Sequence, residues 1–173
     1  MEVIKQTTKE YFKVLSIVHM ALVMGPIFGG LISVMLSFNK ITIIDQDESF
    51  YKVLLYVVSA FYAIGLIANP YIFRSKLASI KNNQDLGHKI SNYRSALITR
   101  YALIEGLAYF SLVATFITSR FIFLAYLAFS VLLLIYWRPT KENLIADLEL
   151  NRDETGIINN PDAVISVVTT NRY

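Results

Sequence analysis

The residue with the clearest potential for chemistry is Glu105, a carboxylate in the middle of an apolar run from Ala96 to Ser119. A helix over this run is long enough to cross a hydrocarbon core roughly 30 Å thick at about 1.5 Å per residue. Glu105 would then lie near the middle of the bilayer, where a charged carboxylate is costly unless it is protonated, paired or hydrated. It is either a proton- or ion-binding group or a hydrogen-bonded residue that fixes helix packing, and both interpretations stay open.

Two other polar residues in apolar runs are candidates for the same site. His19 lies one to two turns into the first run, where an imidazole can accept a proton or bond to Glu105; the alternative is a buried histidine with a purely structural role. Asn69, directly before Pro70, either caps freed carbonyls or lines a polar pocket. Arg100 is five residues before Glu105 and not on the same helix face, so we expect it to extend to the membrane interface.

These residues would be positioned by membrane-spanning helices. The chain of 173 residues is 55% hydrophobic, above the roughly 45–50% of soluble domains. We therefore predict an all-α membrane protein with four transmembrane helices in two hairpins and a short cytoplasmic tail. The first apolar run is too long for a signal peptide, so we expect it to be retained. The predicted spans are 14–38, 50–73, 96–119 and 121–137 in a transmembrane domain of residues 1–138, and the tail of residues 139–173 carries a short helix at about 141–150.

The distribution of Lys and Arg predicts the orientation of the helices. The central loop and both terminal flanks are basic, whereas the first loop is acidic and the third holds only Arg120. Cytoplasmic loops carry an excess of Lys and Arg, so both termini and the central loop are expected on the cytoplasmic side of the cell inner membrane. The residues expected at this basic surface are Arg74, Lys76, Lys81, Lys89, Arg94 and Arg100.

The segments outside the spans also carry structural signals. Apolar residues at three- and four-residue steps precede the third span, which predicts that its helix begins before the membrane as an amphipathic extension. Thr140 is a suitable cap for the tail helix. A β-prone run at Ala163 to Val168 follows, and the tail is either disordered or an edge that docks on a partner. The apolar residues of the extension are Leu86, Ile90, Tyr93 and Leu97.

Small residues recur along the first and third spans and predict close helix packing. Without such residues, helix backbones in lipid cannot approach closely. Pro26, within the first span, is expected to bend it. The predicted packing residues are Ala21, Gly25, Gly29, Ser33 and Ser37 in the first span and Ala102 and Gly106 in the third.

The first and third spans share a short pattern. His19 to Gly25 aligns with Arg100 to Gly106 at an offset of 81 residues, with Glu105 in the place of Met24. The alignment indicates either an internal repeat of two hairpins or chance similarity between apolar helices.

The segment from Tyr93 to Ile117 resembles the ion-carrying helix of the proteolipid, or c-ring, subunits of rotary ATPases. The resemblance is limited to this helix, and the second span holds one glycine, Gly65, where the proteolipid partner helix has a glycine ladder. It implies that Glu105 takes up and releases a proton. The matching residues are Arg94, Ala102, Leu103, Glu105, Gly106, Leu107, Ala108 and Phe110.

The composition excludes several classes of function. There is no cysteine, which excludes disulfides, thiolate metal sites and cysteine nucleophiles. No Ser, His and Asp constellation, phosphate-binding loop or metal-spaced set appears, so we expect no enzyme, metal or cofactor, and no nucleic-acid partner.

The remaining hypotheses concern the membrane. The first is an integral membrane subunit of a multi-protein or homo-oligomeric assembly, with the lipid bilayer and further copies or other membrane subunits as partners. The alternative is a small proton- or cation-translocating protein that uses Glu105.

Overall fold

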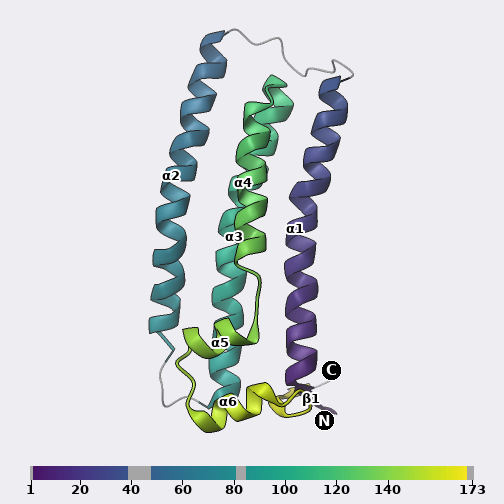
Figure 1. The fold of residues 1–173 in the computed structure, drawn as a ribbon, viewed down its shortest axis with the longest axis vertical. Coiled ribbons are helices and arrows are strands. Elements are labelled where there is room, and N and C mark those ends of the chain that lie inside the picture. Colours follow the sequence, from purple (N-terminus) through teal and green to yellow (C-terminus); the bar gives the residue numbers. More distant parts are fainter. Residues whose placement is uncertain (1, 39–47, 81–84, 171–173) are drawn as a thin grey trace. The chain divides into compact units, whose positions relative to one another are not determined.

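The computed structural model describes residues 2–38, 48–80 and 85–170, which are mostly helical (Figure 1). The chain separates into two units: an apolar unit of Met20–Ile72 and Arg100–Trp137, and a polar unit of Met1–His19, Phe73–Thr99 and Arg138–Tyr173. The elements in chain order are β1 (Glu2–Thr7), α1 (Thr8–Phe38), α2 (Glu48–Ala78), α3 (Leu86–Thr118), α4 (Ile122–Tyr136), α5 (Lys141–Asp147), α6 (Arg152–Asn159) and β2 (Val164–Thr170).

The long helices are typical of a multi-pass membrane protein. Three of them, α1, α2 and α3, are long and apolar enough to cross a membrane, and the bent pair of α4 and α5 raises the number of candidate spans to four. The expected helical membrane fold is confirmed at this level, although the short strands β1 and β2 make the chain mostly helical and not all-α. Each long helix contains 31 to 33 residues, or about 46–50 Å. That length exceeds a hydrocarbon core of roughly 30 Å, so part of each helix extends beyond it.

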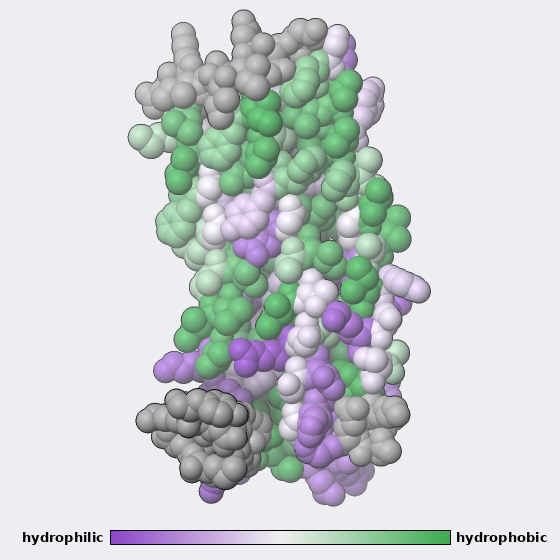
Figure 2. Space-filling view, turned by 180° about the vertical axis from the view of Figure 1, so that it is seen from behind, coloured by the Kyte–Doolittle hydropathy of each residue, from purple (hydrophilic) through white to green (hydrophobic). Residues whose placement is uncertain are grey.

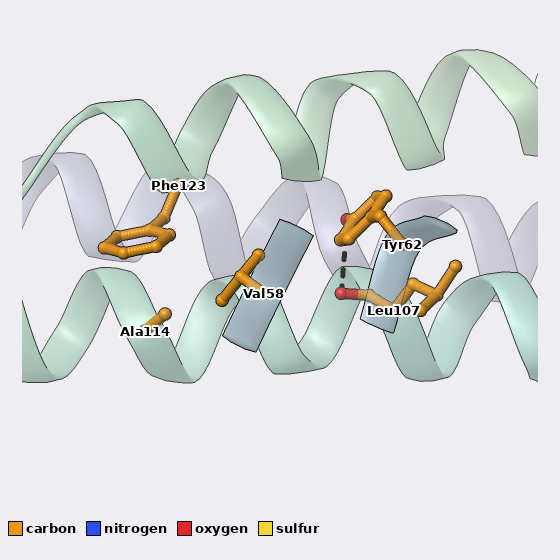
Figure 3. Close-up of a cluster of buried hydrophobic side chains, with 5 residues drawn as sticks. All are labelled: Val58, Tyr62, Leu107, Ala114 and Phe123. Carbon is orange, nitrogen blue, oxygen red and sulfur yellow. Dashed lines mark hydrogen bonds between the residues drawn. The ribbon is translucent and has the colours of Figure 1, made fainter. Parts of the chain in front are cut away.

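In the apolar unit, α2, α3 and α4 pack around one cluster of buried side chains. Figure 3 shows Val58 and Tyr62 of α2 facing Leu107 and Ala114 of α3 and Phe123 of α4. The outer side of the helices is also apolar, as the hydrophobic surface in Figure 2 shows. Large side chains that remain exposed in the apolar unit include Phe28, Leu31, Met35, Val53, Ile64, Ile67 and Leu132. Exposed apolar patches of this extent mark an interaction with a membrane or a protein.

Glycines bring α1 close to its neighbours in the apolar unit. A Cβ at Gly29 would lie 2.5 Å from a methyl group of Leu112 on α3, and a Cβ at Gly30 would lie 2.7 Å from Leu127 on α4. Gly65 of α2 approaches Leu107 of α3 in the same way, at 2.7 Å. Both α1 and α2 therefore pack against α3. In each of these two contacts the glycine belongs to α1 or α2, and the leucine belongs to α3.

In the polar unit, the first half of α3 is the element against which the tail packs. Ile90, Tyr93 and Leu97 are buried there, so the predicted amphipathic extension of the third span is confirmed. Two polar contacts hold the tail helices: Lys89 pairs with Glu154 of α6 at 2.7 Å, and the Tyr93 hydroxyl donates to Asp147 of α5 at 2.9 Å.

Both tail helices have capped N-termini. The Thr140 hydroxyl accepts the backbone N–H of Asn143 at 3.1 Å at the start of α5. Asn151 and Glu154 form a capping box at the start of α6, with the Glu154 N–H donating to the Asn151 side chain at 2.9 Å and the Asn151 N–H donating to Glu154 at 3.1 Å. These caps satisfy backbone groups that a short helix leaves unpaired.

The tail ends in a strand that pairs with the start of the chain. β2 lies antiparallel to β1, with Lys5 opposite Val167, so the predicted β-prone run is confirmed as a strand. The backbone N–H of Thr8 continues the pairing by donating to Ala163 at 3.0 Å. The tail, which the sequence left as either disordered or an edge that docks on a partner, is ordered as a strand paired with the N-terminal strand of its own chain. Its docking on a partner stays a prediction.

Candidate functional site

Two polar side chains of α3 converge on α1 in the apolar unit. Glu105 and Tyr109 are four residues apart and therefore lie on one face of α3. A Cβ at Gly25 of α1 would lie 2.6 Å from the Tyr109 hydroxyl and 3.7 Å from a Glu105 carboxylate oxygen. Gly25 therefore leaves the space that the Tyr109 hydroxyl occupies, and Glu105 lies at an ordinary contact distance from it.

The carboxylate is not enclosed by its own chain. Glu105 is half-buried, and Tyr109 is 42% exposed. The expectation of a buried carboxylate on the third helix is therefore not met in the part of the chain that the structure describes. The physical reason is that α1 covers only one side of this face of α3. A Cβ at Gly106 would have no neighbouring atom within 4 Å. Ala102, one turn before Gly106, is exposed.

The predicted packing residues divide into contacts and open positions. Gly25 and Gly29 lie at the contact between α1 and α3, and Ser33 is buried. Ala21 of α1 is exposed, as are Ala102 and Gly106 of α3. The side chain of Ser37 lies outside the residues that the structure describes. Gly25, Gly29 and Ser33 of α1 therefore pack inside the chain, whereas Ala102 and Gly106 of α3 face outward.

The other two candidates of the proton site, His19 and Asn69, are both buried. His19 is buried within the polar unit, whereas Glu105 belongs to the apolar unit. Asn69 is 2% exposed, and its amide donates to the backbone carbonyl of Arg100 at 2.9 Å. The Arg100 guanidinium lies 4.0 Å from the ring centroid of Trp137, a cation–π contact. Asn69 thus joins α2 to α3 near the end of the span, in a packing role.

The predicted basic residues have different environments. Lys89 is buried in the polar unit, where it forms the ion pair with Glu154. Arg74 is exposed, and Lys76, Arg94 and Arg100 are half-buried. Lys81 lies outside the described residues.

A hydrogen-bond cluster around Tyr62 was missed by the sequence analysis. The Tyr62 hydroxyl lies 2.8 Å from Ser111 of α3 and 2.7 Å from Ser130 of α4, and it is within 2.9 Å of the carbonyl of Tyr126. The Ser59 hydroxyl adds a 2.7 Å contact to Tyr126. One phenol therefore joins three helices through their hydroxyls and carbonyls. Its signal in the sequence is weak, because isolated Tyr and Ser residues are common in membrane helices.

Removal of the Tyr62 hydroxyl is expected to loosen this junction. The substitution Tyr62→Phe should lower the free energy of unfolding by about 1–2 kcal/mol, because it removes the shared partner of buried hydroxyls. Chemical denaturation in detergent measures the change. Tyr56→Phe is the control, since Tyr56 lies on the same helix but is 74% exposed. Equal effects of the two substitutions would show that the hydroxyl of Tyr62 adds nothing to stability.

No known protein family, characterised protein or solved structure matches the chain. The resemblance to the proteolipid helix therefore rests on the residues of α3 alone and stays a prediction. Glu105 and Tyr109 determine what chemistry this face of α3 can perform. A carboxylate accepts hydrogen bonds, a phenol donates and accepts them, and a protonated carboxyl does both.

Proposed function

We propose that the protein is an integral membrane subunit that assembles with further copies of itself through the face of α3 that carries Glu105. The observation that supports this proposal is the half-buried carboxylate about nine residues into the third predicted span. A charged carboxylate exposed to lipid at that depth costs about 2.5–3.5 kcal/mol on insertion scales. A neutral carboxyl still needs a hydrogen-bond partner there. The Tyr109 hydroxyl of the same chain is one such partner. A neighbouring subunit over this face would supply further partners and exclude lipid.

The chemistry of the face favours a second copy as the neighbour. Glu105 supplies an acceptor and Tyr109 a donor, so two copies related by a two-fold axis would be complementary to each other. Ala102 and Gly106 are small and exposed on the same helix, which permits close approach of two α3 backbones. The pairing of β1 with β2 supports the proposed topology of four spans, because it places the two ends of the chain together. The basic residues favour the cytoplasmic side of the inner membrane for both ends.

Cross-linking in membranes tests this assembly. The chain has no cysteine, so single cysteines can be introduced without removing others. Oxidation of Ala102→Cys should yield a covalent dimer, whereas Ala63→Cys, an exposed position on α2, should stay monomeric. Combining Ala102→Cys with Glu105→Leu should reduce the yield of dimer. The absence of a dimer at residue 102, or equal yields at residues 102 and 63, would contradict the proposal.

A second candidate function is proton or cation translocation by Glu105. It is favoured by the position of the Tyr109 hydroxyl beside the carboxylate at Gly25, since a phenol can stabilise either protonation state of a neighbouring carboxyl. Proton flux into liposomes should then be lost in Glu105→Gln and reduced in Tyr109→Phe. If the wild-type protein carries no flux while Glu105→Gln changes only the oligomeric state, the assembly function stands alone.

A further inference from the structure

Each of the four predicted spans ends in a cation on the side of the chain termini. The four residues lie within two positions of a span end, and all four belong to the polar unit. Lys13, Arg74 and Arg138 are exposed and Arg94 is half-buried. No ion pair found among the described residues includes any of them. Arg138 interacts electrostatically with Glu142 and is therefore partly compensated within the chain. These four cations, called the span-end cations below, form no close ion pair among the described residues and can bind an external anion.

Charge is segregated within the polar unit according to distance from the spans. Seven charged side chains of the polar unit lie within seven residues of a point where the chain passes into or out of the apolar unit. Six of these seven are basic, and Glu142 is the one carboxylate. In the rest of the unit, the described residues include eight carboxylates and four basic side chains, one of which is the buried Lys89. In its described part, the polar unit is therefore not uniformly basic, and most of its cations lie within seven residues of the apolar unit in the sequence.

The cations at the opposite span ends have a different environment. At the start of α2, Glu48 lies 3.8 Å from Lys52 and 3.5 Å from Arg120, which precedes α4. One carboxylate of the protein thus partly neutralises both cations. Among the described residues, none of the span-end cations has an ion pair of this kind.

We propose that the span-end cations bind the phosphate groups of anionic phospholipids in the leaflet on the terminus side. A cation at the end of an apolar helix reaches the headgroup layer by extending its long side chain along the surface. Anionic headgroups attract juxtamembrane basic residues, and the guanidinium of arginine can bind a phosphate through two parallel hydrogen bonds. The stacking of Arg100 on Trp137 places an aromatic ring and a cation at the same span end, as at membrane interfaces. This inference does not depend on Glu105 or on the assembly.

Lipid binding by the purified protein in neutral detergent tests the inference. Phosphatidylglycerol is titrated against the wild type, against a variant with Lys13→Gln, Arg74→Gln, Arg94→Gln and Arg138→Gln, and against a control variant with Lys5→Gln, Lys52→Gln, Arg120→Gln and Arg152→Gln. Both variants lose four cations. The affinity of the first should fall by about fivefold for each neutralised residue, whereas that of the control should stay within about twofold of the wild type, because its cations lie away from these span ends.

Three further measurements complete the test. Phosphatidylcholine should bind the wild type and the first variant equally weakly, and added salt should weaken the binding of phosphatidylglycerol. If the fourfold variant does not fold, Arg74→Gln and Arg138→Gln are measured singly, each with the same expected fivefold loss. Equal loss of affinity in both fourfold variants would overturn the inference, since it would show attraction by net charge alone. Competition by inorganic phosphate as strong as that by the lipid would also overturn it, because a soluble anion would then be the ligand.

Discussion

Replacing Gly29 by leucine is expected to destabilise the apolar unit by about 3 kcal/mol, the upper part of the range for overpacked cores. A Cβ at this position would lie 2.5 Å from Leu112, whose side chain is itself buried between α3 and α4. The collision therefore cannot be relieved by swinging Leu112 into open space. The loss should appear as a lower midpoint of thermal or chemical unfolding in detergent.

Gly106→Leu is the matched control for this substitution. Both changes place a leucine at a helical glycine in an apolar run, but a Cβ at Gly106 would have no neighbouring atom within 4 Å. The stability of the isolated chain should therefore change by less than about 0.5 kcal/mol. The same substitution should weaken self-association, because Gly106 lies beside Glu105 on the face proposed to meet the second copy. A neutral Gly29→Leu variant would show that α1 does not pack on α3 as described.

Breaking the ion pair between Lys89 and Glu154 is expected to release the tail from α3. Glu154→Gln should lower the stability of the polar unit by about 3 kcal/mol, because it leaves a buried ammonium without its counter-charge. Glutamine can still serve in the capping box at the start of α6, so the substitution tests the ion pair and not the cap. Limited proteolysis of the tail, compared with the wild type, measures the release.

A double substitution separates the ion pair from the packing around it. Replacing Lys89 by methionine and Glu154 by leucine removes both charges and keeps a similar volume, which often restores or increases stability. We expect the double variant to resist proteolysis better than Glu154→Gln alone. A double variant as labile as the single one would indicate that the contact contributes something other than paired charge.

The same pair makes the attachment of the tail dependent on pH. Burial acts to raise the pKa of Glu154, but hydrogen bonds from Lys89 and from the backbone of Asn151 outweigh it, and the pKa is lowered from its ordinary value of 4.5. A carboxyl with a lowered folded-state pKa stabilises the fold fully above its unfolded-state pKa, and this stabilisation is lost as the pH falls through the folded-state value. Proteolysis of the wild-type tail should therefore increase below about pH 4, with a smaller change in Glu154→Gln. A tail equally protected at low pH would contradict this role of Glu154.

The features that the sequence predicted are those set by local patterns. Long apolar runs define α1, α2 and α3 because a helix that crosses lipid must be apolar along its length. The three- and four-residue spacing of Ile90, Tyr93 and Leu97 predicted the extension of α3, since such spacing lines one helix face. The β-branched residues of β2 likewise favoured a strand.

The features that could not be predicted depend on contacts between distant residues. The strand β1 has lysine and glutamine among its residues and gains its conformation by pairing with β2, more than 150 positions later in the chain. Lys89 was expected at a basic surface, but its charge is compensated by Glu154, 65 residues away. The exposure of Glu105 depends on which helices cover α3, and no periodicity within α3 determines that.

In the proposed assembly, another subunit covers the face around Glu105 in the bilayer. A nitroxide label attached at Ala102→Cys in the reconstituted protein reports this directly through its collisions with oxygen dissolved in the lipid. We expect markedly lower oxygen accessibility at residue 102 than at Ala63→Cys, although both side chains are exposed in the single chain. Equal and high accessibility at the two positions would mean that lipid contacts the carboxylate face, and the proposed assembly would be wrong.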